Sequence, residues 1–463
     1  MSSAIDEGVS FALETYDKLK AKNFDLLYLP KHDEFPSMSQ YNTSGLPHFS
    51  ITPSYYGSKI SYAKIIDKGL ESNSITSWNK LKEYIHKSDE FEHFYEFKDL
   101  TQEGEEKKQL TSFVLFNTLK GFIDSLIHQL DNPRNKTQKR RKLEQQFLNS
   151  FKLESLEYDV LVPIILYQPV FNNFKFDDNT EIVKIDDKLQ LARNYRVPDT
   201  IIANKEMISA ATHAVLIKQK VRRVSNANRW DRSEQVSSKI QRLYSHIDKV
   251  FACLRIAMKM PLGYCQILAV PKNFGDNYQA ELIGLSIFGR DRYPRLYTRD
   301  DLYTHYRIDH KTLNKAKKLY KVNFKSRNLN YAIDKLLDSD SRIRDEDGII
   351  DISSAFESLL SDSTNNLKYK ISLRAAVICK FFPVGFTPVE VKRNIGVFYD
   401  LRSGIVHGNK KSTVDSKRMV SIGDQGQIKT YTFGKYILTH ILETVILNPK
   451  WIEVQFIDEN MLK

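Results

Sequence analysis

The chain has 463 residues, of which 41% are hydrophobic and 27% are charged, close to the composition of an average soluble globular protein. This composition excludes an intrinsically disordered chain, and the length exceeds what one hydrophobic core usually serves, so two or three domains are expected. The formal net charge of +12 favours association with a polyanion such as nucleic acid, without indicating which one.

We find no signal for export, membrane insertion or metal binding in the sequence. The start MSSAIDEGVSFALE has neither the basic nor the apolar part of a signal peptide, and no later run approaches the roughly 18 apolar residues of a membrane span. The cysteines Cys253, Cys265 and Cys379 lack CxxC spacing, and His305 and His310 have no third ligand nearby. We therefore expect a cytoplasmic protein with reduced cysteines, no membrane partner, no metal and no cofactor.

Residues 1–155 are predicted to be mostly helical. The clearest helix spans residues 110–130, where one apolar face is formed by Phe113, Phe116, Leu119, Phe122, Ile123, Leu126, Ile127 and Leu130. Pro133 ends this helix, and a basic stretch at 134–142 follows. That stretch is either the solvated start of the next helix or a phosphate-binding patch.

Residues 156–325 are predicted to be a mixed α/β region. Short apolar runs at 161–171, 264–271 and 281–289, bounded by turn-forming residues, indicate strands. Residues 234–260 have the apolar spacing of one long helix. The basic segment 213–230, which ends in a tryptophan, suits either a nucleic-acid backbone with one stacked base or a simple exposed edge.

Residues 326–463 are predicted to be an all-α bundle. Four helices are expected, at 345–362, 367–382, 388–407 and 429–447, because each has helical apolar spacing and suitable end signals. Their modest connecting loops favour antiparallel packing. The predicted fold class is therefore an α+β multidomain protein, in which a helical region and a mixed regulatory or sensor region precede a helical bundle.

The segment YDLRSGIVHG, residues 399–408, carries an arginine and a histidine suited to RNA cleavage. His407 can exchange a proton near neutral pH, and Arg402 can hold a phosphate through two hydrogen bonds. The 2′-hydroxyl of RNA supplies the nucleophile, so no serine or cysteine is required. On a regular helix the two side chains point about 140° apart, although Gly404 and Gly408 loosen the backbone near the histidine.

Three segments together are similar to a known family. IIDISSAFESLL (349–360), LKYKISLRAAVI (367–378) and YDLRSGIVHG resemble, in order and spacing, the Apea-like HEPN domain, a branch of the HEPN superfamily. The resemblance covers about residues 328–450. It implies a HEPN-type bundle and a metal-independent endoribonuclease that is commonly completed across a homodimer.

The resemblance also assigns residues. It places Arg402 and His407 on the R-x4-6-H ribonuclease motif, and Ser403 on the polar position after the arginine, where Asn is common in active members. Glu357 resembles the acidic residue of the first helix that points at the site. Lys410 and Lys411 follow the motif and either bind flanking phosphates or lie in a solvated loop.

Residues 162–186 are similar to a β-containing region found beside this domain in bacterial antiviral proteins. The implied protein is a toxin-like ribonuclease of antiphage defence, acting by abortive infection, with a sensor or regulator in its amino-terminal part and a phage-derived trigger. Its expected partners are RNA, with transfer RNA as one candidate, and a second copy of the chain. The alternatives are a non-catalytic RNA-binding or dimerisation module and, more distantly, a DNA-binding regulator.

Overall fold

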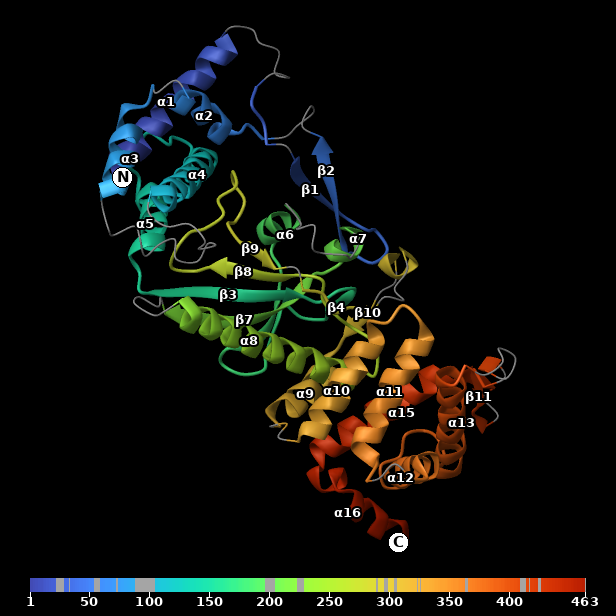
Figure 1. Cartoon of the computed structure of the whole chain (residues 1–463). Coiled ribbons are helices and arrows are strands. Elements are labelled where there is room, and N and C mark those ends of the chain that lie inside the picture. Colours follow the sequence, from blue (N-terminus) through green and yellow to red (C-terminus); the bar gives the residue numbers. More distant parts are fainter. Residues whose placement is uncertain are drawn as a thin grey trace. The chain divides into compact units, whose positions relative to one another are not determined.

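The computed structural model describes the chain except for residues 22–28, 33, 54–58, 72–73, 88–104, 196–204, 223–228, 289, 295–298, 304–305, 323, 325, 363–364, 409–413, 416, 424–425 and 463. Helices and short strands are both present, which confirms a mixed α+β fold (Figure 1). No helix in the described part of the chain has the length and apolar character needed to cross a membrane.

The chain forms two compact units. The first comprises Met1–Pro163, Asp177–Val236 and Gln266–Arg290, and the second comprises Ile164–Phe176, Ser237–Cys265 and Asp291–Lys463. Both units therefore combine segments that are distant in sequence, whereas the sequence suggested three consecutive regions with boundaries near residues 155 and 325.

Four helices of the first unit pack around a fifth, α4. The helices are α1 (Ser2–Ala21), α2 (Tyr62–Glu71), α3 (Thr76–Lys87), α4 (Glu105–Gln129) and α5 (Gln138–Lys152), and α4 contacts each of the other four. Aromatic rings fill this core: Trp78 stacks on Phe116, and Phe122 stacks on Phe147 with 4.5 Å between ring centroids. The predicted helix at 110–130 is confirmed, but Phe113 of its apolar face is 64% exposed, whereas Leu115 and Phe116 are buried.

The first unit also contains an antiparallel sheet. Its strands run in the order β6 (Thr180–Lys184), β7 (His213–Arg222), β3 (Ser155–Pro163), β8 (Ile267–Pro271) and β9 (Ser286–Phe288). Helices α6 (Asp187–Asn194) and α7 (Lys205–Ser209) and the hairpin of β1 (Glu34–Gln40) with β2 (Pro47–Pro53) complete the unit. Leu161 and Leu268 of the sheet share a buried apolar cluster with Leu189 and Ala192 of α6.

The two basic stretches of the first unit have different outcomes. Residues 134–142 form the solvated start of α5 except for Arg140, whereas residues 213–222 are not an exposed edge. Arg140 is neither solvated nor free for phosphate: it is buried, pairs with Asp6, and donates from Nε to Glu144 Oε1 at 2.8 Å. The segment 213–222 is β7, an inner strand and not an edge. Residues 223–228 of the same basic segment lie outside the described part of the chain.

The second unit is mainly helical. Its short strands are β4 (Tyr167–Pro169), which pairs in parallel with β10 (Tyr306–Ile308), and β5 (Asn173–Lys175). Its helices are α8 (Arg229–Met258), which begins in the first unit, η3 (Arg299–Tyr303), α9 (His310–Lys321), α10 (Arg327–Asp340), α11 (Asp345–Leu360), α12 (Leu367–Phe381), α13 (Pro388–Val406), α15 (Thr430–Leu447), η5 (Pro449–Ile452), α16 (Val454–Glu459) and η6 (Asn460–Leu462). The predicted long helix at 234–260 is therefore confirmed as α8.

Four of these helices form one bundle, in which α11, α12, α13 and α15 each contact the other three. The rings of Phe356 and Phe398 meet edge to face in its core, and a Cβ on Gly434 would lie only 2.6 Å from the Phe398 ring. Glycine at this position therefore lets α15 approach α13 closely. The four predicted helices are confirmed, but a hairpin of β11 (Met419–Ser421) and β12 (Gln427–Lys429) also occurs, so the region is not entirely helical.

A buried ionic group links three helices of the second unit. Arg255 of α8 and Lys435 of α15 both pair with Asp340 of α10, and the Arg255 Nε to Asp340 Oδ2 distance is 2.5 Å. Burial alone would raise the pKa of Asp340, but the two cations outweigh it and hold the pKa below its usual value. Asp340 is therefore ionised at neutral pH, and α8, α10 and α15 are joined by charge as well as by apolar packing.

Candidate active site

Helix α13 positions the predicted catalytic residues. Thr387 caps its first turn, and its side chain accepts the Glu390 amide proton while the Glu390 carboxylate accepts the Thr387 amide proton. Pro388 occupies the first helical position, where a missing N–H has no cost. A buried stripe then anchors α13 in the bundle as far as Leu401, the residue before Arg402.

Arg402 faces α11. Its Nη2 lies 3.7 Å from Glu357 Oε1, which is an ion pair without a hydrogen bond, and the two side chains are 31% and 28% exposed. Arg402 Nε and Glu357 Oε1 are buried and have no hydrogen-bond partner within the described residues. The arginine is therefore held in place by charge while its hydrogen-bonding capacity remains unused.

Tyr399 lies beside the Arg402–Glu357 pair on the buried side of α13. It is buried one helical turn before Arg402, and its hydroxyl donates to the Ser353 carbonyl of α11 at 3.3 Å. Burial raises the pKa of Tyr399 well above its usual value, and the negative charge of Glu357 adds to this effect. Tyr399 therefore stays protonated and orients α13 against α11 without taking part in proton exchange.

His407 ends α13. Its backbone N–H donates to the Ser403 carbonyl at 3.0 Å, and Gly408 follows with a φ of +64°, the left-handed conformation that commonly closes a helix. The side chain is exposed and makes no hydrogen bond or ion pair with another described residue. Gly404 lies inside the regular helix, so the backbone is not loosened there as the sequence suggested.

The structure does not bring Arg402 and His407 together within one chain. No hydrogen bond or ion pair joins them among the described residues, and at 100° per residue they point about 140° apart around the helix axis. Ser403 is exposed between them. Lys410 and Lys411 lie outside the described residues.

A groove that we did not predict lies between α12 and α13. It encloses about 700 Å³ and is lined by Asn366, Leu367, Lys368, Tyr369, Ser372, Val389, Lys392, Arg393, Gly396, Val397 and Asp400. Lys392 Nζ lies 5.4 Å from the centre of the Tyr369 ring, and Lys368 pairs with Asp400 at 2.7 Å. Since His407 follows Asp400 by seven positions, it lies within about 20° of Asp400 around α13, on the side of the groove.

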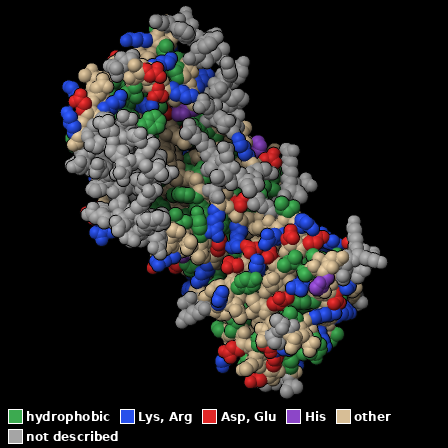
Figure 2. Space-filling view, in the orientation of Figure 1, with side chains coloured by type: hydrophobic (Ala, Val, Ile, Leu, Met, Phe, Trp, Pro, Cys, Tyr) green, Lys and Arg blue, Asp and Glu red, His purple; other side chains and the backbone are tan. Residues whose placement is uncertain are grey.

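The groove had a signal in the sequence, because lysines and a tyrosine begin α12 and a Lys-Arg pair occurs early in α13. Elsewhere the positive charge is largely balanced. On the face of the molecule in Figure 2, basic and acidic side chains are interspersed over each unit where they are described. Many of them are paired, for example Lys220 with Glu157 and Lys335 with Asp351.

No protein-family model, no curated protein and no solved structure matches this chain. What bears on its function is therefore the arrangement of its own residues.

Proposed function

We propose that the chain is a metal-independent endoribonuclease of HEPN type, with Arg402 and His407 as its catalytic residues. The observation that carries this proposal is the state of Arg402, which is anchored at 3.7 Å from Glu357 yet has a buried Nε without a hydrogen-bond partner. The Arg402 side chain is also 31% exposed, so part of its guanidinium group is open to solvent beside Glu357. An arginine with donors to spare is suited to a phosphate group.

In the proposed reaction, His407 removes the proton from the 2′-hydroxyl of RNA as general base, or protonates the leaving 5′-oxygen as general acid. The 2′-oxygen attacks phosphorus, the bond from phosphorus to the 5′-oxygen breaks, and a 2′,3′-cyclic phosphate results. Arg402 stabilises the negative charge that develops on the phosphate oxygens. Ser403 and Glu357 support the site, the first by its exposed hydroxyl and the second by orienting the arginine.

The separation of Arg402 from His407 supports a site completed by a second copy of the chain. Each chain would present its arginine towards α11 and its histidine at the end of α13, and two such surfaces would provide both groups to one phosphate. We expect a homodimer in sedimentation experiments. A monomer that cleaves RNA at the same rate at every concentration would contradict this arrangement.

The groove between α12 and α13 is the proposed path of the RNA. Lys368, Lys392 and Arg393 supply positive charge for phosphates, and the 59% exposed Tyr369 provides a ring for base stacking. Lys392→Glu is expected to weaken RNA binding and to lower its dependence on salt. The matched control is Lys450→Glu, an exposed lysine of η5 that does not line the groove, and this substitution should leave both unchanged.

The test of the reaction uses the full-length chain with total RNA and transfer RNA, with and without a chelator. Cleavage by the wild type is expected to fall at least about 100-fold in Arg402→Ala and in His407→Ala. Arg344→Ala serves as the control, since Arg344 is 70% exposed and makes only a 3.8 Å ion pair with Glu346. Equal cleavage by all four proteins would place the activity elsewhere.

The groove also favours a second candidate, a non-catalytic RNA-binding module in which the bundle mediates binding or dimerisation. RNA binding that weakens steeply with salt, without cleavage products in vitro or in phage-infected cells, would support this alternative.

If the proposed nuclease activity is correct, we further propose that the chain is a toxin-like effector of antiphage defence, regulated by residues 1–325. Because residues 164–176 and 237–265 belong to the second unit, the deletion that tests this is limited to residues 1–152, and it should change the toxicity of the chain to its host.

A further inference from the structure

The first unit contains a cluster of potential metal ligands far from Arg402 in sequence. His32, Asp124 and His128 each place a ligand atom within 4.8 Å of the other two. The side chains are 11%, 2% and 14% exposed, so the cluster lies inside the unit. Among the described residues, no other group of three or more such side chains meets this condition.

Local structure explains how the three side chains meet. Asp124 and His128 are four positions apart on α4 and therefore share one face of the helix. His32 is brought to them by a short backbone bridge, in which Lys31 pairs with Ile60 and the His32 amide donates to the Lys59 carbonyl. The start of α2, directly after this bridge, donates the Tyr62 amide proton to Asp124 Oδ1 at 2.7 Å.

The carboxylate of this cluster is buried between two histidines. Asp124 is only 1% exposed, and a buried carboxylate is costly unless it is paired. His32 Nε2 lies 2.7 Å from Asp124 Oδ2, yet it is buried and makes no hydrogen bond, so a proton on it would not point at the carboxylate. An imidazole nitrogen that lies beside a carboxylate without a hydrogen bond to it has a geometry in which one metal ion can bind both groups.

The distances also suit a small divalent ion. Donor atoms around a tetrahedral ion with bonds of about 2.0–2.1 Å lie about 3.3 Å apart. The separations here are 2.7 Å from His32 Nε2 to Asp124 Oδ2 and 3.7 Å from His128 Nε2 to Asp124 Oδ1, so each histidine lies beside a different oxygen of the carboxylate. His128 Nε2 is also 2.8 Å from the Ile60 carbonyl oxygen, to which it donates a proton when no cation is bound. A bound cation replaces that proton, and the carbonyl oxygen becomes available as a fourth donor.

We propose that His32, Asp124 and His128 bind one divalent first-row transition cation, such as Zn²⁺ or Fe²⁺. Two imidazoles and one carboxylate form a donor set that both ions accept. The Tyr195 hydroxyl lies 3.3 Å from His32 Nδ1 and serves as the outer partner that orients the ring. The ion ties α4 to the bridge that precedes α2, so it stabilises the first unit.

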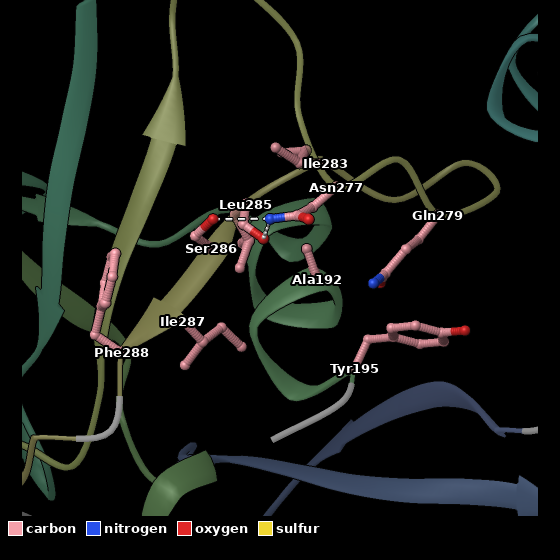
Figure 3. Close-up of a pocket in the computed structure, with 9 residues that line it drawn as sticks. All are labelled: Ala192, Tyr195, Asn277, Gln279, Ile283, Leu285, Ser286, Ile287 and Phe288. Atoms are coloured by element: carbon pink, nitrogen blue, oxygen red, sulfur yellow. Dashed lines mark hydrogen bonds between the residues drawn. The ribbon is translucent and has the colours of Figure 1, made fainter. Parts of the chain in front are cut away.

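The proposed ion also lies near a cavity. Tyr195 borders a hollow of about 340 Å³, which is further lined by Ala192, Asn277, Gln279, Ile283, Leu285, Ser286, Ile287 and Phe288. Figure 3 shows the Tyr195 ring at one side of this hollow, with the Gln279 side chain pointing towards it. The cation is thus linked through His32 and Tyr195 to a space large enough for a small molecule.

The test measures the zinc and iron content of the purified full-length chain by mass spectrometry. The wild type is expected to carry roughly one cation per chain, and Asp124→Asn and His128→Ala less than about a tenth of that. Asp124→Asn keeps an acceptor for the Tyr62 amide and removes the charge. His48→Ala is the control in the same unit, since His48 lies on β2 and contacts Ser39 instead of the cluster.

A second measurement does not depend on the variants folding. Wild type stripped by a chelator is titrated with Zn²⁺ or, without oxygen, with Fe²⁺, and the melting temperature of the first unit is expected to rise with one of them. The ion present in the chain as purified identifies the natural class, since in competition Zn²⁺ displaces Fe²⁺ from most nitrogen and oxygen sites. Stripped wild type that binds neither ion, or equal metal content in wild type and cluster variants, would overturn the proposal and leave a buried Asp–His pair.

This inference stands apart from the proposed nuclease. Asp124→Asn leaves Arg402 and His407 intact, so loss of metal with retained RNA cleavage would support both proposals. Loss of cleavage on brief chelation that zinc restores, in a chain whose Arg402→Ala variant remains active, would support the metal site and contradict the nuclease mechanism.

Discussion

Replacing Arg402 with alanine distinguishes a catalytic arginine from a structural one. The only ion pair of Arg402 among the described residues joins it to Glu357 at 3.7 Å, and both side chains are about a third exposed. At an effective dielectric constant of 20, two charges at this distance attract by about 4 kcal/mol. Solvent screening and the loss of side-chain entropy reduce the net stabilisation by such a pair to about 1 kcal/mol or less.

Arg374 provides the structural comparison in the same bundle. Its side chain is 3% exposed, and it donates to Asp458 at 2.7 and 2.8 Å, to Asp362 at 3.1 Å and to the Leu360 carbonyl at 2.7 Å. Breaking a buried ion pair costs about 3–5 kcal/mol. Because both carboxylates are partly exposed and regain water, Arg374→Ala should lie near the lower end, at about 3 kcal/mol.

The assay combines urea unfolding, followed by circular dichroism, with RNA cleavage on gels. Arg402→Ala is expected to retain nearly all of the unfolding free energy of the bundle while its cleavage falls at least about 100-fold. Arg374→Ala is expected to lose stability first and activity only as it unfolds. An Arg402→Ala chain that loses about as much stability as Arg374→Ala, or cleaves RNA normally, would refute a catalytic assignment.

Two further predictions concern the bundle. Gly434→Ala should destabilise the bundle by about 1–3 kcal/mol, because the added Cβ would lie 2.6 Å from the Phe398 ring. The control Gly396→Ala, whose Cβ would lie 3.5 Å from Lys368, should be neutral or stabilising. Equal melting temperatures of the two variants would contradict this prediction. Burial lowers the pKa of His440, so below about pH 6.5 the unfolded chain takes up a proton that the folded chain does not, and stability falls. His440→Gln should reduce the stability difference between pH 8 and pH 5.5, and an unchanged difference would be evidence against this assignment.

Local sequence signals were sufficient for the helices around the candidate site. Thr387, Pro388 and Glu390 specify the start of α13 through contacts within one turn, and Pro383 with Gly385, whose φ is +87°, ends α12. The apolar spacing of α11 and α13 also identified their buried faces, since Phe356 and Phe398 are both fully buried. These features depend on residues within a few positions of each other, so the chain order alone reveals them.

Which side chains become neighbours of each other could not be predicted from such local patterns. The residue order could not show that Arg402 points at Glu357 while His407 lies exposed at the end of α13, because this depends on how α13 is rotated against α11. Arg140 looked like a surface charge until Asp6 and Glu144 were found to enclose it. Each of these outcomes requires contacts between segments distant in the chain.

The cluster of His32, Asp124 and His128 combines a feature that is visible in the sequence with one that only the structure shows. The spacing of Asp124 and His128 on α4 was visible in the sequence and is a usable signal for two ligands on one helix face. The arrival of His32 was not, because it depends on the bridge of Lys31 with Ile60. The sequence by itself determined the composition class and the helices of the bundle, and it singled out Arg402 and His407 as candidates for RNA cleavage. Only the tertiary structure decided which side chains meet, since burial and pairing arise from long-range packing that no local pattern encodes.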